Sequence, residues 1–270
     1  MELDSGCILR FSGSISPNPL GISLLTVQNM LNAMIKLRNH GLFGLLTYTY
    51  VISLFPKSDL IRALILVPIL LYSIVVLDKL NPKVEVFKLS YLDILLGVLS
   101  AIPYILIIYE VRSFTVLIPI TLLLLSLYFF HERKSMWGNV VGTAFISALS
   151  FILTLFVNNP FYLLIPSFWT LYTFTQALYV EYKIPYRKLD RKVLMVSWSI
   201  SLFLLITLSI YLNAFLILLA LVEPSVRFFK PGEKLKSSKE IRSLGRGGMK
   251  RDLLFVTLTV VTSYLVFFRV

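Results

Sequence analysis

The densest group of chemically capable side chains in the chain is the segment His131–Asn139, which reads HERKSMWGN. Its histidine titrates near neutral pH, its glutamate can accept or donate a proton, and Arg133 can bind an anion through paired N–H groups. The segment follows Phe114–Phe130, an apolar run whose polar side chains belong only to Thr, Ser and Tyr. In a chain this apolar, such a polar segment indicates a place for chemistry or recognition.

Further polar side chains stand at the ends of other apolar runs. We expect the catalytic residues to be His40, His131 and Glu132. We expect the ligand-binding residues to be Asn39, Asp93, Arg133, Asn139, Gln176, Glu181, Lys183, Arg227 and Arg246. Asp93, Gln176 and Glu223 lie within or against apolar runs, where polar groups are costly and usually paired or functional. The alternatives are that loops carry charge because water is there, and that Asp93 only balances the dipole of its own helix.

If Asp93 faces inward, it needs a positively charged partner. The cations that the sequence offers on that side are His40, Arg133, Lys183 and Arg227. We therefore predict that one of these four contacts the Asp93 carboxylate.

The composition predicts which elements position these residues. The 270-residue chain is 57% hydrophobic and 15% charged, with a mean hydropathy of +0.82. A soluble domain carries about a quarter charged residues, so the sequence indicates an all-α polytopic membrane protein. We expect a tail and an interfacial helix over residues 1–38, without a secretory signal, and one transmembrane bundle over residues 39–270. The single cysteine, Cys7, can form no internal disulfide.

About nine transmembrane helices are expected, because about 17–25 mostly apolar residues are needed to cross the bilayer core. The expected spans are Gly41–Phe55, Leu60–Leu77, Tyr91–Tyr109, Phe114–Phe130, Gly138–Val157, Phe161–Val180, Val193–Leu212, Phe215–Val222 and Leu253–Phe268. The eighth is short and could continue to Phe229. Tight turns are expected at Asn158-Asn159-Pro160 and at Asn213, and a polar loop from Lys230 to Arg251.

The basic residues predict how this bundle is oriented. Nine spans place alternate loops on opposite sides, and 22 of the 26 Lys and Arg residues then fall on the side of the amino terminus. Because cytoplasmic loops are rich in Lys and Arg, we expect a cell-membrane protein whose amino terminus is cytoplasmic and whose carboxyl terminus is outside. The net charge of +12 is then explained by orientation and by attraction to anionic lipid, without nucleic acid.

Three chemistries can be compared on the cytoplasmic side. Metal-diphosphate chemistry needs two carboxylates three or four residues apart on a helix, and the acids of the central loops are more widely spaced. A diphosphate held by Lys183, Arg187, Arg227 and Arg246 is left open, with backbone N–H groups of Gly245-Arg246-Gly247-Gly248 at a helix start. Haem held by His40 and His131 and transport along half-buried acids are also left open. One cysteine and two distant histidines offer no zinc site, so no metal site is expected and the cofactor is unknown.

Several short motifs resemble the YwiC-like family of membrane proteins. They are His40-Gly41, Glu132-Arg133 with Asn139, the segment Phe174–Ile184, the segment Pro224–Arg227, and Ile241–Gly245 before a final span. The resemblance covers about Lys36–Phe268, and its nine-span layout is similar to that of UbiA-type prenyltransferases at the level of fold. The family tends to have Glu after the glycine that Gly245 matches, whereas this chain has Arg246. The family has no settled activity to carry over.

Together these observations predict a protein that binds an isoprenoid or lipid-like amphiphile in a polar chamber open to the cytoplasm. His40, His131 and Glu132 would do proton or hydrogen-bond work, and Arg133, Lys183 and Arg227 would hold an anion. Whether the ligand is also modified is left open by the sequence. The alternatives are a non-enzymatic accessory or haem-carrying subunit of a membrane complex, with that complex as partner, and a transporter. Membrane lipids are expected partners in every case.

Overall fold

The computed structural model describes residues 40–268. These residues fall within one compact unit. The predicted tail and interfacial helix, with Asn39, lie outside the described residues.

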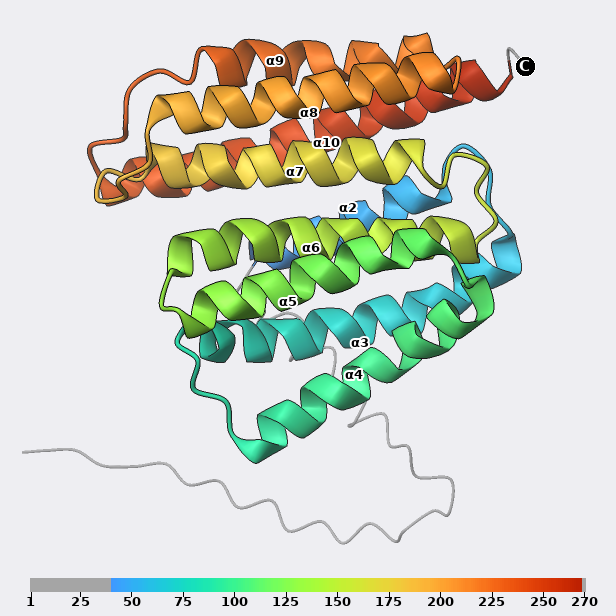
Figure 1. Cartoon of the computed structure of the whole chain (residues 1–270), viewed down its shortest axis with the longest axis horizontal. Coiled ribbons are helices and arrows are strands. Elements are labelled where there is room, and N and C mark those ends of the chain that lie inside the picture. Colours follow the sequence, from blue (N-terminus) through green and yellow to red (C-terminus); the bar gives the residue numbers. More distant parts are fainter. Residues whose placement is uncertain (1–39, 269–270) are drawn as a thin grey trace, which may run out of the picture. The chain divides into compact units, whose positions relative to one another are not determined.

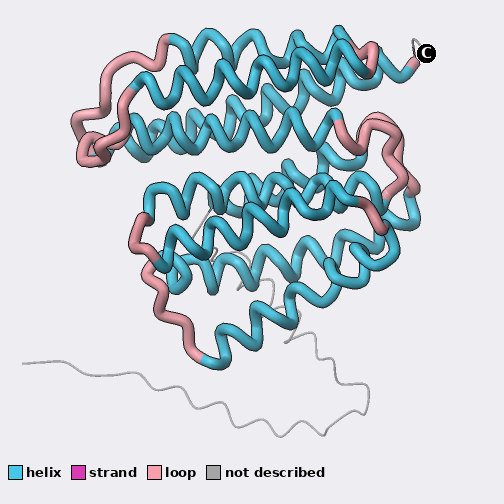
Figure 2. The backbone as a smooth tube through the Cα atoms, viewed as in Figure 1, coloured by secondary structure: helices cyan, strands magenta, loops and turns pink. Residues whose placement is uncertain are grey.

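Every regular element in the described part of the chain is a helix (Figures 1 and 2). The elements are α2 (His40–Leu54), α3 (Leu60–Glu85), α4 (Tyr91–Val111), η1 (Phe114–Val116), α5 (Leu117–His131), α6 (Ser135–Phe156), α7 (Leu164–Lys183), α8 (Arg191–Tyr211), η2 (Phe215–Leu221), α9 (Val222–Phe229) and α10 (Ser238–Phe267). Consecutive long helices run antiparallel and are joined at two ends of the unit (Figure 2). The all-α part of the prediction is confirmed.

Five helices in the described part are long and apolar enough to cross a membrane. They are α3, α4, the continuous segment Phe114–His131, α6 and α8. The apolar part of α2, Gly41–Leu54, is shorter. Because a soluble domain has no reason to carry five such helices, they indicate a multi-pass membrane protein.

Helix α6 lies at the centre of the bundle and packs against α5, α7 and α2. In its apolar part 67% of the residues are buried, against 6% for α4. Small residues allow this close packing: a Cβ at Gly138 would lie within 2.9 Å of the Phe130 ring, and the Ser126 hydroxyl donates to the Gly138 carbonyl at 3.0 Å. The centre of the bundle is therefore α6, and α4 lies at its periphery.

Asparagine turns end two of the helices, as the sequence predicts. Asn158 and Asn213 both adopt a left-handed backbone, with φ of 57° and 52°, which asparagine tolerates better than most residues. The next residue, Asn159, donates from its amide to the carbonyls of Ser53 at 2.9 Å and Phe55 at 2.7 Å. This turn therefore ties α6 to the end of α2.

The predicted polar loop Lys230–Arg251 is wrong beyond residue 237, because α10 already begins at Ser238. The Ser237 hydroxyl caps the helix by accepting from the backbone N–H of Glu240, and the Lys, Arg, Glu and Leu residues that follow are good helix formers. Gly245-Arg246-Gly247-Gly248 is therefore helix interior. Its N–H groups are not those of a helix start, so they do not offer the backbone anion contact that the sequence left open.

Candidate functional site

A buried ionic network joins α7, α9 and α10, and we call it the Arg227 network. The Arg227 guanidinium donates through Nη1 to Oε1 of Gln176 and through Nη2 to the Tyr172 hydroxyl at 3.3 Å. The Tyr172 hydroxyl in turn donates to Oδ1 of Asp252 at 2.8 Å. Glu223, one helical turn before Arg227, places Oε1 3.4 Å from its Nε. The network thus links three helices through one arginine.

Aromatic rings surround the Arg227 guanidinium. Its central carbon lies 4.5 Å from the Phe228 ring centroid, 5.5 Å from that of Tyr179 and 5.8 Å from that of Tyr172. Cation–π attraction at these distances strengthens as water is excluded. Among the described residues the buried Nε contacts Glu223 as an ion pair and makes no hydrogen bond.

Helical spacing explains how the network assembles. Tyr172 and Gln176 are four residues apart on α7, as Glu223 and Arg227 are on α9, so each pair shares one helix face. The Tyr172 ring stacks on Phe255 of α10, with centroids 3.9 Å apart and an interplanar angle of 4°. This stack fixes the position of the hydroxyl that bridges Arg227 and Asp252.

A second cluster lies at the end of α7, and we call it the Glu181 cluster. Glu181 is 7% exposed, and its Oε2 lies 2.9 Å from Nε of Arg187. Asn139 of α6 also donates a hydrogen bond to Glu181, and Arg187 donates to the Ser135 hydroxyl at 3.3 Å. Burial raises the pKa of the Glu181 carboxyl above its ordinary value, and the nearby Arg187 charge opposes this.

Lys183 anchors the α9–α10 loop over the end of α7. Its Nζ donates to the Glu233 carbonyl at 2.6 Å, and the neighbouring Tyr182 hydroxyl donates to the Gly232 carbonyl at 2.9 Å. Burial lowers the pKa of the Lys183 ammonium, and the positive charge of Arg251 acts in the same direction. Nε of Arg251 also lies 4.0 Å from Oε1 of Glu223 in the Arg227 network. Arg251 therefore connects Lys183 electrostatically to that network. The two clusters and Lys183 together form what we call the polar layer.

The structure brings some of the predicted site residues together and separates others. Gln176 contacts Arg227, and Asn139 contacts Glu181. His131 is exposed, with its ring edge-on to Phe87 at 5.3 Å and its Nδ1 3.7 Å from Glu132.

Two other predicted site residues lie apart from these pairs. Arg133, in a left-handed turn, and Arg246, on α10, are exposed. His40 is the first residue of α2. A cavity shared by the two histidines remains a prediction.

Asp93 pairs with a residue that the sequence analysis did not suggest. Its Oδ1 accepts from Lys83 Nζ at 2.6 Å, and its Oδ2 accepts from the backbone N–H and the hydroxyl of Ser90. The expectation of a partner among the four other cations is therefore wrong. Asp93 and Ser90 form a capping box at the start of α4, which favours the helix-start interpretation of this carboxylate.

Four residues of the polar layer were not chosen as site residues, although Arg187 was considered for a diphosphate and Glu223 as an acid against an apolar run. They are Tyr172, Arg187, Glu223 and Asp252. The spacing of four residues from Tyr172 to Gln176 and from Glu223 to Arg227 is the signal that could have identified two of them. Arg187 and Asp252 carry no comparable signal, because their partners lie on other helices.

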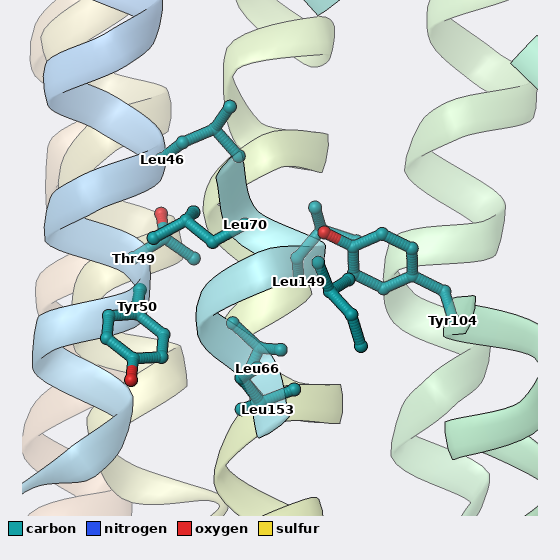
Figure 3. A pocket seen from close by; sticks show the side chains of 9 residues that line it. Leu46, Thr49, Tyr50, Leu66, Leu70, Tyr104, Leu149 and Leu153 are labelled. Carbon is teal, nitrogen blue, oxygen red and sulfur yellow. The ribbon is translucent and has the colours of Figure 1, made fainter. Parts of the chain in front are cut away.

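A small cavity lies between α2, α3, α4 and α6 (Figure 3). Its volume is about 10 Å³, which is room for one water molecule at most. Tyr104 at its wall shares a hydrogen bond with the Ser73 hydroxyl at 2.9 Å. This cavity is too small for an organic ligand, and none of its lining residues belongs to the polar layer.

Comparison with known protein families, curated proteins and solved structures finds no match for this chain. Within residues 40–268 no three His, Cys, Asp or Glu side chains are grouped as metal ligands would be. What the polar layer offers is charge-assisted hydrogen bonding by Arg and Lys beside buried carboxylates.

Proposed function

We propose that this protein is a nine-span membrane protein that binds an amphiphile whose head group lies in the polar layer and whose tail lies between helices. The resemblance to the YwiC-like family is part of this proposal and rests on the sequence motifs alone. Binding is the proposed activity, and the residues of the polar layer fit it without a chemical step.

The observation that carries the proposal is the burial of charged side chains at one end of the bundle. Glu181, Lys183 and Arg227 are only 7%, 8% and 8% exposed. Removing such groups from water costs several kcal/mol each even after the structure relaxes. Buried charge in a membrane bundle therefore supports a functional role.

The arginines of the polar layer favour an anionic head group. Its cations are Lys183, Arg187 and Arg227, and its acids are Glu181, Glu223 and Asp252. An anion is therefore favoured by the chemistry of arginine and not by an excess of charge. Arginine is well suited to an oxygen-rich anion, because its planar guanidinium can donate two parallel hydrogen bonds.

The nine-span topology adds α2, α7, the η2–α9 segment and α10 to the five long apolar helices. The segment Phe215–Phe229 contains both η2 and α9, and together they are long enough to enter the bilayer deeply. With the amino terminus in the cytoplasm, as the bias of Lys and Arg predicts, the polar layer faces the cytoplasm. The carboxyl terminus is then outside the cell.

The proposal is tested by identifying what co-purifies with the protein. Wild-type protein is extracted in a mild detergent, and bound small molecules are identified by native mass spectrometry and lipid analysis. We expect an anionic amphiphile in the wild type and about tenfold less of it in Arg227→Lys, because lysine keeps the charge but loses the paired donors. An absorbance spectrum of the same sample tests the haem alternative, which predicts a Soret band.

The matched control is Arg251→Lys, which makes the same change at a side chain that is 40% exposed. This control should retain the amphiphile. The proposal fails if folded Arg227→Lys protein carries as much of the same amphiphile as the control. Folding of each variant is checked by size-exclusion chromatography and by the melting temperature.

A further inference from the structure

A groove on the surface between α7 and α8 is separate from the polar layer. Its volume is about 520 Å³, it is open along one side, and apolar side chains make up most of its lining. Leu171 and Phe174 line it from α7, and Val196 and Ile200 line it from α8. We propose that this groove binds one acyl chain of an anionic phospholipid, with the lipid phosphate at Lys192.

The length of the groove fits one acyl chain in one leaflet. Lys192 and Ser201 both line it, and at 1.5 Å per residue they lie about 13 Å apart along α8. Half of the bilayer core is about 15 Å thick. Because α8 is one of the five helices long enough to span the membrane and Lys192 lies in its first turn, the groove runs from the membrane surface towards the bilayer centre.

Charge complementarity identifies the head group. Lys192 is the charged residue in the lining, and its ammonium makes no ion pair or hydrogen bond with the rest of the described chain. Two further basic residues, Lys188 and Arg191, are exposed at the same end of α8. A lysine at the membrane surface attracts an anionic lipid, so the open groove favours lipid with a net negative head group over a zwitterionic one.

The groove and the Arg227 network lie on opposite faces of α7. Leu171 and Phe174 share the groove face, whereas Tyr172 and Gln176 face α9 and α10. The inference therefore rests on the proposed membrane placement but not on the amphiphile site. A variant at Lys192 should change groove binding and leave the ligand of the polar layer in place.

The test is a lipid count by native mass spectrometry. The whole protein is reconstituted in nanodiscs of equal parts phosphatidylglycerol and phosphatidylcholine, then released gently from the lipid. We expect one retained phosphatidylglycerol in the wild type and in Lys192→Arg. We expect about fivefold weaker retention in Lys192→Ala, the change that corresponds to about 1 kcal/mol at 1.4 kcal/mol per tenfold.

Two matched variants keep the test decisive. Lys134→Ala removes an exposed lysine outside the groove and should retain the lipid. Val196→Trp adds bulk at a half-exposed groove position and should displace it. Equal retention in Lys192→Ala and Lys134→Ala overturns the head-group assignment, as does equal retention of phosphatidylcholine. Retention of phosphatidylglycerol by folded Val196→Trp overturns the groove as the site. If the wild type instead forms a stable dimer that Val196→Trp loses, the groove binds a second copy of the chain and the lipid proposal is overturned.

Discussion

Replacing Arg227 with alanine should destabilise the fold strongly, and the size of the effect follows from its contacts. The change removes hydrogen bonds to Gln176 and to the Tyr172 hydroxyl, each worth about 1.5–3 kcal/mol because the donor is charged. It also leaves the Glu223 carboxylate without its closest cation. Breaking a fully buried ion pair by removing one partner costs about 3–5 kcal/mol. Because the Glu223 side chain is 35% exposed, we expect a loss near the lower end of that range for Arg227→Ala.

The assay is thermal unfolding in detergent, followed by the fluorescence of the buried Trp169 and Trp198. The matched control is Arg251→Ala. Its Nε lies 4.0 Å from Glu223, and its side chain is 40% exposed. A pair exposed to this degree is worth less than about 1 kcal/mol, so the control should melt within a few degrees of the wild type.

A second substitution distinguishes an unpaired charge from lost packing. In Arg227→Met the aliphatic part of the side chain is kept, and adding Glu223→Gln removes the carboxylate that has lost its partner. If uncompensated charge is the cause, the double variant should recover part of the stability. Equal melting temperatures for Arg227→Ala and Arg251→Ala would refute the reasoning, because the network would then contribute no more than a surface pair.

Three further predictions concern topology, a helix cap and pH. A membrane-impermeant thiol reagent on intact cells should miss Cys7 and label Val270→Cys, and labelling of Cys7 alone would reverse the orientation. Asp93→Asn should lower the melting temperature by weakening the α4 capping box but leave the co-purified amphiphile unchanged; loss of the amphiphile from folded protein would return Asp93 to the site. Burial raises the pKa of Asp252, just before span nine, to about 6. Between about pH 4 and pH 6 the folded protein therefore binds a proton that the unfolded chain has lost. The melting temperature should fall as pH rises through that range. Asp252→Asn should remove this dependence of the melting temperature on pH.

Much of the helical framework could be predicted from the sequence because lipid demands long apolar segments with satisfied backbones. The turns at Asn158 and Asn213 were also predictable, since short polar residues interrupt long apolar runs there. The early start of α10 was not predicted, because a segment rich in charged residues indicates a loop unless its helix cap is recognised. Ser237 with Glu240 three residues later is that cap, and it was the missed signal.

The partners within the polar layer were less predictable than its location. Gln176 and Arg227 were chosen separately, and only the packing of α7 against α9 places them in contact. The partner of Asp93 was also not predictable. This partner, Lys83, lies ten residues away across a helix–helix turn, where sequence distance alone gives no reason to prefer it over other cations. Pairing across helices depends on rotation about each helix axis, which apolar length does not determine.

The two ends of the bundle show that buried charge is not needed to hold these helices together. At one end Arg62 joins α3 to α4 and α6: it lies 2.8 Å from Glu110 and donates to the Phe156 carbonyl at 2.9 Å. The side chains of Arg62 and Glu110 remain 33% and 48% exposed, so these contacts form with little loss of hydration. At the other end the side chain of Arg227 is 7% exposed and bears the full desolvation cost. A structural link alone would not require that cost, which supports a role for the buried Arg227 guanidinium beyond holding the helices together.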